Sequence, residues 1–261
     1  MSEMNFQTRD GVQRKLGYAI QKEDHDYLNS HGEDPRLLMK RFSDSFPAFN
    51  IESKPTDILR IKNQGSVGAC QGFSLSTVFE ICYFLATGRQ ETFSAMAGYI
   101  LSQRYDGLLG RDVGSTLSAG EKVATEHGLC LDKDWRFPGR YDTRIPSGIQ
   151  YPFKLVHSRP TSDASVVQEA IDIGLPVHVG IPWGREMDAE HVENFVGSGG
   201  GGHAITFWLN SLINSWADWN GDGMSSYSYR ALEQMCAHQW GVFIIYAPDG
   251  MSFPDLDVVE P

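Results

Sequence analysis

The chain has 261 residues, of which 41% are hydrophobic and 21% charged, a composition that suits one large globular domain or two small lobes. Its formal net charge of −11 argues against a nucleic-acid-binding surface and against anionic membranes, because both need clustered cations on the protein. The apolar runs are too short for a membrane-spanning helix, and the N-terminal residues show no signal peptide of the Sec type.

The chain carries four cysteines: Cys70, Cys82, Cys130 and Cys236. Their spacing contains no CxxC pair, which argues against a zinc site, and four are too few for a disulfide framework. We therefore expect free thiols and a cytoplasmic or other reducing compartment. The stretch 218–223 matches the start of a calcium loop, but Tyr229 stands where that loop needs an acidic ligand. We expect no metal and no cofactor.

In chain order, residues 1–45 are polar and charged, and we interpret them as a loosely packed N-terminal extension or a short propeptide-like arm before a main domain over 46–261. The apolar pattern then predicts a helix over 70–87 that stops at Gly88. Further helices are expected over 94–105, over 115–127 and from residue 162 or 163 to 173.

After residue 175 the pattern changes to short β-rich runs divided by glycine-rich turns: VHVGI, HAITFWL, SLINSW and GVFIIYA. Such runs are typical of strands. The first half is thus mainly helical and the second mainly strand. This segregation predicts an α+β protein of two lobes, helical over about 46–150 and β-rich over about 151–261, with a cleft between them.

Cys70 is the candidate nucleophile, because it lies at the start of its expected helix. The unpaired amide groups of a helix N-terminus carry partial positive charge, which favours the reactive thiolate. Gly65 and Gly68 allow a tight turn before the thiol, and the side-chain amide of Gln64 is placed to donate to an oxyanion. The competing interpretation is ordinary, since most free cysteines are small buried hydrophobic residues.

A thiol nucleophile needs a general base, and His203 is the best candidate among eight histidines. It follows a glycine-rich run and opens the expected strand 204–209. A second strand turning at residues 210–211 would bring Asn214 close to it, so that the amide oxygen accepts from one ring nitrogen and leaves the other for sulfur. Trp216 could shield that hydrogen bond from water. Taken singly, each residue also has an ordinary structural interpretation. His203 would be a histidine at the start of a strand, Asn214 a turn residue and Trp216 a core residue.

With these residues in this order, the sequence resembles the papain-like cysteine peptidases. The resemblance rests on Asn63-Gln64-Gly65, Gly68-Ala69-Cys70, Gly202-His203-Ala204 and Asn214-Ser215-Trp216, and covers about residues 46–247. The separations from the cysteine, 133 residues to His203 and 144 to Asn214, match the family's spacing.

The resemblance implies a two-lobe fold with a β-barrel-like second lobe and an extended polypeptide substrate in the cleft. It implies that Cys70 is the nucleophile, His203 the acid and base, Asn214 its orienter and Gln64 the oxyanion donor. It also implies that Gly114 and Ser115 meet the substrate backbone. Ala204 would line the pocket for the side chain two residues before the cut, and Trp216 would also contact substrate.

The sequence departs from the family pattern at several positions. Val67 replaces the first cysteine of the nucleophile motif, and the region of its usual disulfide partner, around Asp112, has no cysteine. Gln71 replaces the aromatic residue after the nucleophile, and Ser115 replaces the second glycine of a pair. The best functional interpretation is a cysteine peptidase that works through a thioester. The alternatives are a catalytically silent binding or assembly protein and an acyl transferase on the same fold. The oligomeric state is not indicated by the sequence.

Overall fold

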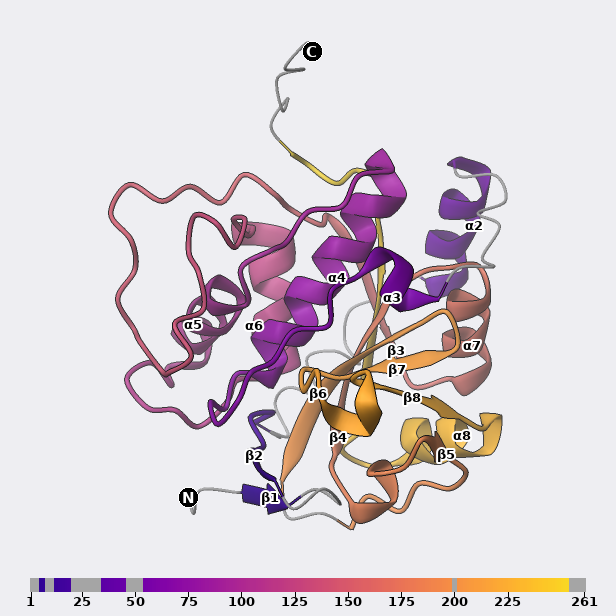
Figure 1. The fold of residues 1–261 in the computed structure, drawn as a ribbon. Helices are drawn as coiled ribbons and strands as arrows, with labels where there is room; N and C mark the ends of the chain where they lie inside the picture. Colours follow the sequence, from indigo (N-terminus) through magenta and orange to yellow (C-terminus); the bar gives the residue numbers. More distant parts are fainter. Residues whose placement is uncertain (1–4, 8–11, 20–33, 46–53, 199–200, 254–261) are drawn as a thin grey trace.

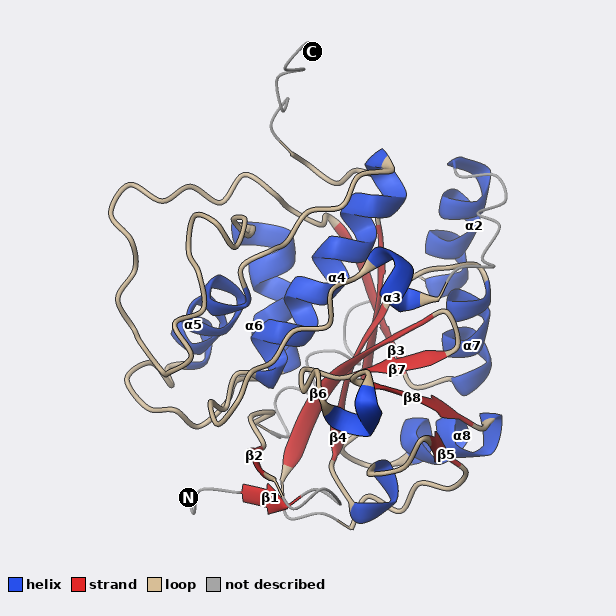
Figure 2. Cartoon of the chain, in the orientation of Figure 1, coloured by secondary structure: helices blue, strands red, loops and turns tan. Residues whose placement is uncertain are grey.

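The computed structural model describes residues 5–7, 12–19, 34–45, 54–198 and 201–253. In these residues a group of helices lies beside a twisted seven-stranded sheet, as Figures 1 and 2 show. The strand order in that sheet is β3-β9-β4-β6-β7-β8-β5. The α+β class expected from the sequence is confirmed.

The helical part begins with the short helix α3 (Pro55–Ile58) and is built around the long buried helix α4 (Cys70–Thr87), which ends at Gly88 in the left-handed conformation, with φ of 70°. Helix α5 (Ala95–Asp106) is capped by the Ser94 side chain. Helix α6 (Leu117–Lys122) continues into the π-helical turn η1 (Val123–His127).

Helices α4 and α5 cross at two glycines. A Cβ atom on Gly72 would overlap backbone atoms of α5, and Gly98 lies on the opposite side of the same contact. The missing side chains therefore let the two backbones approach closely.

The β-rich part is formed by strands that are buried on both faces near the centre of the sheet. The strands are β3 (His157–Thr161), β4 (Val177–Pro182), β5 (His191–Val192), β6 (Gly202–Trp208), β7 (Ser211–Ile213), β8 (Met224–Tyr227) and β9 (Val242–Ala247). All neighbouring pairs are antiparallel except β5 with β8. The accompanying helices are α7 (Ala164–Asp172), α8 (Tyr229–Ala237), η2 (Arg185–Met187) and η3 (Trp219–Gly221).

Strand β6 lies between the two hydrophobic cores and contributes residues to both. Its Ile205 and Phe207 belong to the core beneath the sheet, whereas Ala204 belongs to the core around α4 and α5. This division follows from the two-residue period of a strand. On the α4 side the Thr206 and Ser74 hydroxyls are 2.9 Å apart, so a buried hydrogen bond also joins β6 to the helix.

The N-terminal residues are not a loosely packed extension throughout. Helix α2 (Pro35–Ser45) lies against β3, β9 and α7 (Figure 1), and its Leu38, Met39 and Phe42 are buried in the core beneath the sheet. Leu38 and Met39 lie four and three residues before Phe42, which puts the three side chains on one helix face. The polar average composition of residues 1–45 hides this pattern. Strand β1 (Asn5–Gln7) pairs with β2 (Gln13–Lys15). None of the described helices is long and apolar enough to cross a bilayer.

Candidate active site

Cys70 is the first residue of α4, and its side chain faces the start of β6. The backbone N–H of Ala204 donates to the Cys70 sulfur over 3.4 Å, and the backbone N–H of Gly17 also donates to it. The residue is completely buried. The helical core thus presents a thiol to the residue that directly follows His203.

The expectation of a thiolate at this helix start is wrong for the structure as it stands. Burial raises the pKa of the Cys70 thiol from 9.0 to about 12, and the backbone hydrogen bonds from Ala204 and Gly17 lower it only in part. The cost of removing the charged form from water outweighs the partial charge of the helix terminus. The thiol is therefore protonated at neutral pH.

The His203 ring is held by Asn214, because its Nε2 lies 2.8 Å from the Asn214 side-chain oxygen. That oxygen also accepts the backbone N–H of Ser215 over 2.7 Å, so it is the amide oxygen and the proton lies on Nε2. The remaining nitrogen, Nδ1, is buried and makes no hydrogen bond to any described residue. Burial lowers the pKa of His203 to about 4, against the raising effect of the Asn214 hydrogen bond. The ring is therefore neutral and has one free lone pair.

Two tryptophans fix the plane of that imidazole. Trp216 stacks on the His203 ring at 4.3 Å between centroids and 18° between planes, and Trp183 meets it edge-on at 4.6 Å. Both indoles are fully buried. They exclude water from the bond between His203 and Asn214, and such a bond is stronger in surroundings of low dielectric constant.

The Gln64 side-chain amide is buried and fully oriented by its neighbours. Its nitrogen donates to the Val67 carbonyl oxygen over 2.8 Å and to the Lys15 carbonyl oxygen over 3.1 Å. Its oxygen accepts the Ser215 hydroxyl, and its backbone N–H donates to the Ser215 carbonyl over 2.8 Å. One amide N–H is thus directed at a peptide carbonyl from the N-terminal arm, which is what an oxyanion donor must be able to do.

We call residues 12–19 the arm segment; its strand β2 lies near the start of β6 in Figure 1, and its backbone bonds to Gln64 and to residues of both lobes. Ser115 donates its N–H to the Gly17 carbonyl and accepts the Ala19 N–H, both over 3.0 Å, while the Tyr18 N–H donates to the Gly202 carbonyl over 3.0 Å. The segment therefore bridges α6 and β6. Its Gly17 also contacts the Cys70 sulfur, so the segment contributes to the burial of the thiol.

Glycines make this close approach possible. A Cβ atom on Gly17 would overlap the backbone of Gly68, and one on Gly114, where φ is 90°, would overlap the backbone of Gly17. The two positions predicted to meet substrate backbone, Gly114 and Ser115, thus lie against backbone of the arm segment. Their role toward a substrate stays a prediction.

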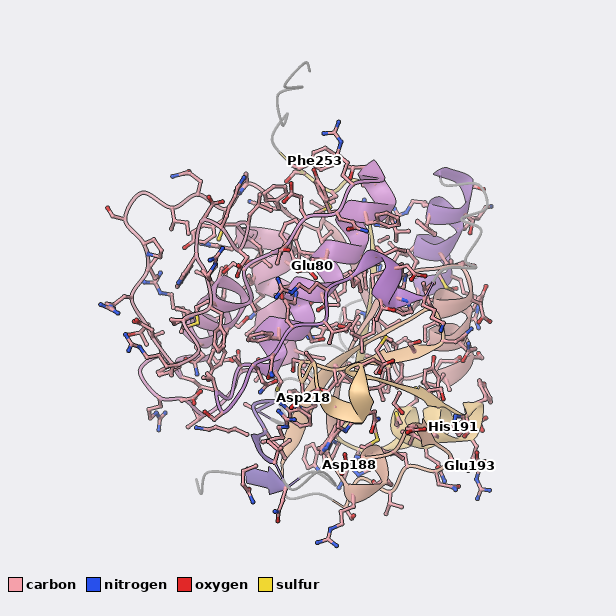
Figure 3. All side chains as sticks on the ribbon, in the orientation of Figure 1. Glu80, Asp188, His191, Glu193, Asp218 and Phe253 are labelled. Atoms are coloured by element: carbon pink, nitrogen blue, oxygen red, sulfur yellow. The ribbon has the colours of Figure 1, made fainter. Side chains whose placement is uncertain are left out.

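Two side chains anchor the arm segment near the site. Arg14 lies over the Trp216 ring, 5.6 Å from its centroid, and pairs with Asp218 (labelled in Figure 3) over 2.8 Å. The Lys15 ammonium pairs with Asp112 over 2.9 Å. Trp216, predicted to contact substrate, therefore contacts the arm.

Asp112 also ties the nucleophile loop to the chain region where the family's disulfide partner would lie. Its Oδ1 accepts the Gly68 backbone N–H and the Tyr99 hydroxyl, each over 2.9 Å. All four cysteines are free. The sequence did not indicate the roles of Asp112, Ser215 and Trp183, because each acts through contacts between distant parts of the chain.

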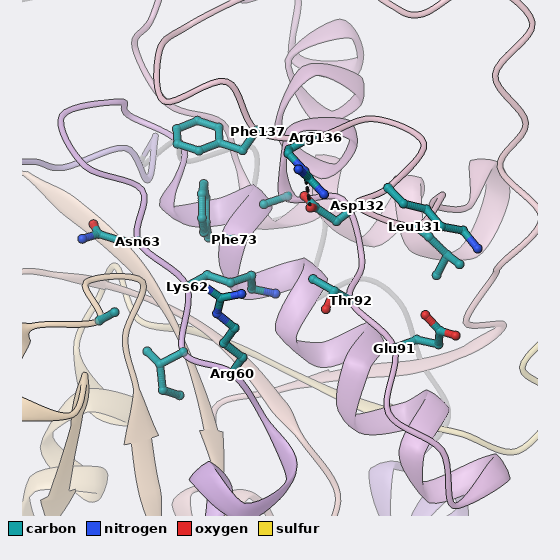
Figure 4. Close-up of a pocket in the computed structure, with 14 residues that line it drawn as sticks. Arg60, Lys62, Asn63, Phe73, Glu91, Thr92, Leu131, Asp132, Arg136 and Phe137 are labelled. Atoms are coloured by element: carbon teal, nitrogen blue, oxygen red, sulfur yellow. Dashed lines mark ion pairs between the residues drawn. The ribbon is translucent and has the colours of Figure 1, made fainter.

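A pocket of about 690 Å³ adjoins the site on the helical lobe (Figure 4). Its lining includes Asn63, which precedes Gln64, and Ala217, which follows Trp216. Arg60, Lys62 and Arg136 give it cationic groups, but Lys62 is paired with Glu80 over 2.6 Å and Arg136 with Asp132 over 3.5 Å. The pocket contains neither the thiol nor the imidazole.

Comparison by sequence finds no matching family model and no matching curated protein. Solved structures do match. The cysteine protease xylellain from Xylella fastidiosa is 16% identical with a TM-score of 0.59, over 89% of this chain and 91% of that one. Procathepsin B S9 from Trypanosoma congolense is 16% identical with a TM-score of 0.60, over 89% and 86%. Bromelain from Ananas comosus, solved with the inhibitor E64, is 16% identical with a TM-score of 0.59, over 75% and 97%. At this identity the likeness establishes the fold. The chain has the two-lobe fold of the papain-like cysteine proteases.

Proposed function

We propose that the protein is a cysteine peptidase that hydrolyses peptide bonds through Cys70 and His203. The observation that carries the proposal is the meeting of two elements. The thiol at the start of α4 takes a hydrogen bond from the residue after His203, whose ring is oriented by Asn214 and keeps one nitrogen free. A merely structural role requires no such arrangement of thiol, imidazole and amide.

In the proposed reaction the free Nδ1 of His203 takes the proton of the Cys70 thiol, and the sulfur attacks the peptide carbonyl carbon. The Gln64 amide N–H, now directed at the Lys15 carbonyl, stabilises the negative oxygen that forms. His203 passes the proton to the leaving amine, and the C–N bond breaks to give a thioester. Water then attacks the thioester, with His203 again as base, to release a carboxylic acid and regenerate the thiol.

The described conformation is a latent form of the proposed enzyme. In this proposal the arm segment takes the space of a substrate. Burial raises the pKa of Cys70 to about 12 and lowers that of His203 to about 4. A thiol and imidazole with those values exist as a neutral pair. Displacement of the arm lets water in, and both pKa values then move toward their ordinary range.

The test compares Cys70→Ala with Cys82→Ala on the same helix, since both side chains are buried and belong to the same core. Both are made in a chain that also carries Gly17→Val, which displaces the arm because a Cβ atom at position 17 would overlap the Gly68 backbone. We expect Cys70→Ala to abolish peptide hydrolysis and the labelling of the protein by an epoxide thiol reagent, located by mass mapping, without loss of the folded transition. Cys82→Ala should retain both. A folded protein that is labelled at other cysteines, or whose hydrolysis survives Cys70→Ala, contradicts the proposal. Product analysis with an added amine distinguishes hydrolysis from acyl transfer.

A further inference from the structure

One peptide group in the loop before the nucleophile is held at both of its ends. Its carbonyl oxygen, that of Val67, accepts the side-chain amide of Gln64 over 2.8 Å. Its N–H, that of Gly68, donates to the Asp112 Oδ1 over 2.9 Å. The peptide between residues 67 and 68 therefore joins the Gln64 amide to the Asp112 carboxylate.

The orientation of that peptide decides where the Gln64 amide points. An amide group is planar, so the N–H bonded to the Val67 carbonyl fixes the direction of the second N–H. The second N–H is the one directed at the Lys15 carbonyl oxygen. Gln64 is completely buried, so an acceptor lost from its amide is costly to replace.

Asp112 is itself held in place by the helical lobe. Its Oδ1 also accepts the hydroxyl of Tyr99, which is completely buried on α5. The same hydroxyl accepts the backbone N–H of Gly114 over 3.1 Å. The backbone of Tyr99 meets Gly72 at the crossing of α4 and α5. The carboxylate is therefore fixed relative to the helix that begins with the thiol.

From these contacts we infer that Asp112 is a positioning residue for the oxyanion site. Its carboxylate sets the peptide between residues 67 and 68, and that peptide aims the Gln64 amide. The inference rests on the proposed function and adds a residue to its machinery. The oxyanion exists only after attack on the peptide carbonyl, so loss of Asp112 lowers kcat and changes KM little.

The first experiment uses the full chain with Gly17→Val, which displaces the arm, and compares Asp112→Leu with Asp112→Asn. Both variants lose the ion pair with Lys15, but only asparagine keeps an oxygen that can accept the Gly68 N–H. We expect Asp112→Leu to lower kcat at least about tenfold, and Asp112→Asn to stay within about threefold, with KM little changed in both.

The control for this experiment is Asp142→Leu, at an aspartate of the same lobe that pairs with Arg144 two residues away. It should leave kcat and KM unchanged. An equal loss of kcat in Asp112→Leu and Asp112→Asn, or a change confined to KM, overturns the inference while the peptidase proposal stands.

A double-mutant cycle tests whether Asp112 acts through Gln64. In a chain that already carries Gln64→Ala, adding Asp112→Leu should lower kcat by less than about twofold, because the group that Asp112 positions is absent. A merely structural role of Asp112 would lower kcat equally with and without Gln64. Losses that multiply in the double variant therefore overturn the inference.

A third experiment needs no turnover and so separates the two proposals. In the otherwise unaltered chain, NMR follows hydrogen exchange of the Gly68 backbone N–H and of the Gln64 side-chain amide. We expect both to exchange at least about tenfold faster in Asp112→Leu than in Asp112→Asn, because only the first loses the acceptor. Thermal unfolding verifies that each variant folds, and Asp112→Ala takes the place of a leucine variant that does not.

Equal exchange in the two variants overturns the role of Asp112, even if no peptide is ever cleaved. Faster exchange in Asp112→Leu, in a protein whose arm-displaced form hydrolyses no peptide, counts against the peptidase alone.

Discussion

Ser215 joins the two halves of the candidate site through three hydrogen bonds. Its backbone N–H donates to the Asn214 side-chain oxygen, its hydroxyl donates to the Gln64 side-chain oxygen, and its carbonyl accepts the Gln64 backbone N–H. Ser215 therefore fixes the positions of both the Asn214 side chain, which orients the imidazole, and the Gln64 amide, which faces a peptide carbonyl. A displacement of the Asn214 side chain should therefore also displace the Gln64 side chain, because breaking only part of a buried hydrogen-bond network is costly.

Asn214 can be tested as the positioning residue for His203. Asn214→Ala removes the acceptor that holds the proton on Nε2, so the ring can rotate or change tautomer. In a chain whose arm is displaced by Gly17→Val, we expect kcat to fall at least about tenfold with a smaller change in KM, because proton transfer depends on the ring position. The control is Asn194→Ala, at an exposed asparagine. A change confined to KM, or an altered unfolding midpoint with normal kcat, would point to a structural role.

At the residue scale, the sequence predicted contacts between residues that are close together in the chain. The turn that brings Asn214 back to His203 lies between two short strands, so their proximity could be inferred from spacing. The protonation state of Cys70 could not, because its burial depends on residues from distant parts of the chain, such as Ala204, that pack in the same core. The partial charge at the helix start favours the thiolate, but burial of the thiol raises its pKa by more.

At the scale of elements, the long helices were the most predictable part of the molecule. Helix α4 begins and ends at the residues that the apolar pattern and Gly88 indicated. The arm segment was not predictable in the same way. It reaches the site through main-chain atoms of Lys15, Gly17 and Tyr18, and main-chain contacts leave no periodic pattern in the sequence.

If the arm segment blocks access to the Cys70 thiol, displacing it should expose that thiol. Gly17→Val introduces a branched side chain where a single Cβ atom already overlaps Gly68, and overpacking of such a contact costs about 1–3 kcal/mol. We expect the labelling rate of Cys70 by a small thiol reagent to rise at least tenfold. Gln13→Val, the same substitution at an exposed arm position, should not change it. Equal labelling rates in the two variants would show that the arm does not protect the thiol.

At the scale of the whole molecule, buried histidines that titrate below pH 7 and a buried cysteine that titrates above it should make the free energy of unfolding greatest near neutral pH. Burial lowers the pKa of His203 to about 4 and of His178 to about 3, from 6.5. A group with a depressed folded pKa contributes stability above pH 6.5 that is lost as the pH falls through the folded value. Burial raises the pKa of Cys70 from 9.0 to about 12, so its contribution is present below pH 9 and is lost as the pH rises toward 12.

We therefore expect the free energy of unfolding to be greatest between about pH 7 and 9 and to fall by a few kcal/mol between pH 6.5 and 4. Urea titrations at fixed pH values measure this directly. His178→Phe offers a matched test, because both His178 ring nitrogens are buried without a hydrogen bond to any described residue. The acid-side slope should become shallower in that variant. An unchanged slope would mean that His178 is already solvated in the folded protein.

The crossing of α4 and α5 has a consequence for how this molecule can change over time. Gly72 lies two positions after the thiol and touches the neighbouring helix through bare main chain. The separation of α4 and α5 near the thiol is therefore set by peptide groups of fixed dimensions and not by the size of apolar side chains. We expect apolar residues elsewhere in this lobe to be replaceable while the spacing of the two helices at the thiol stays constant, as long as both glycines are kept.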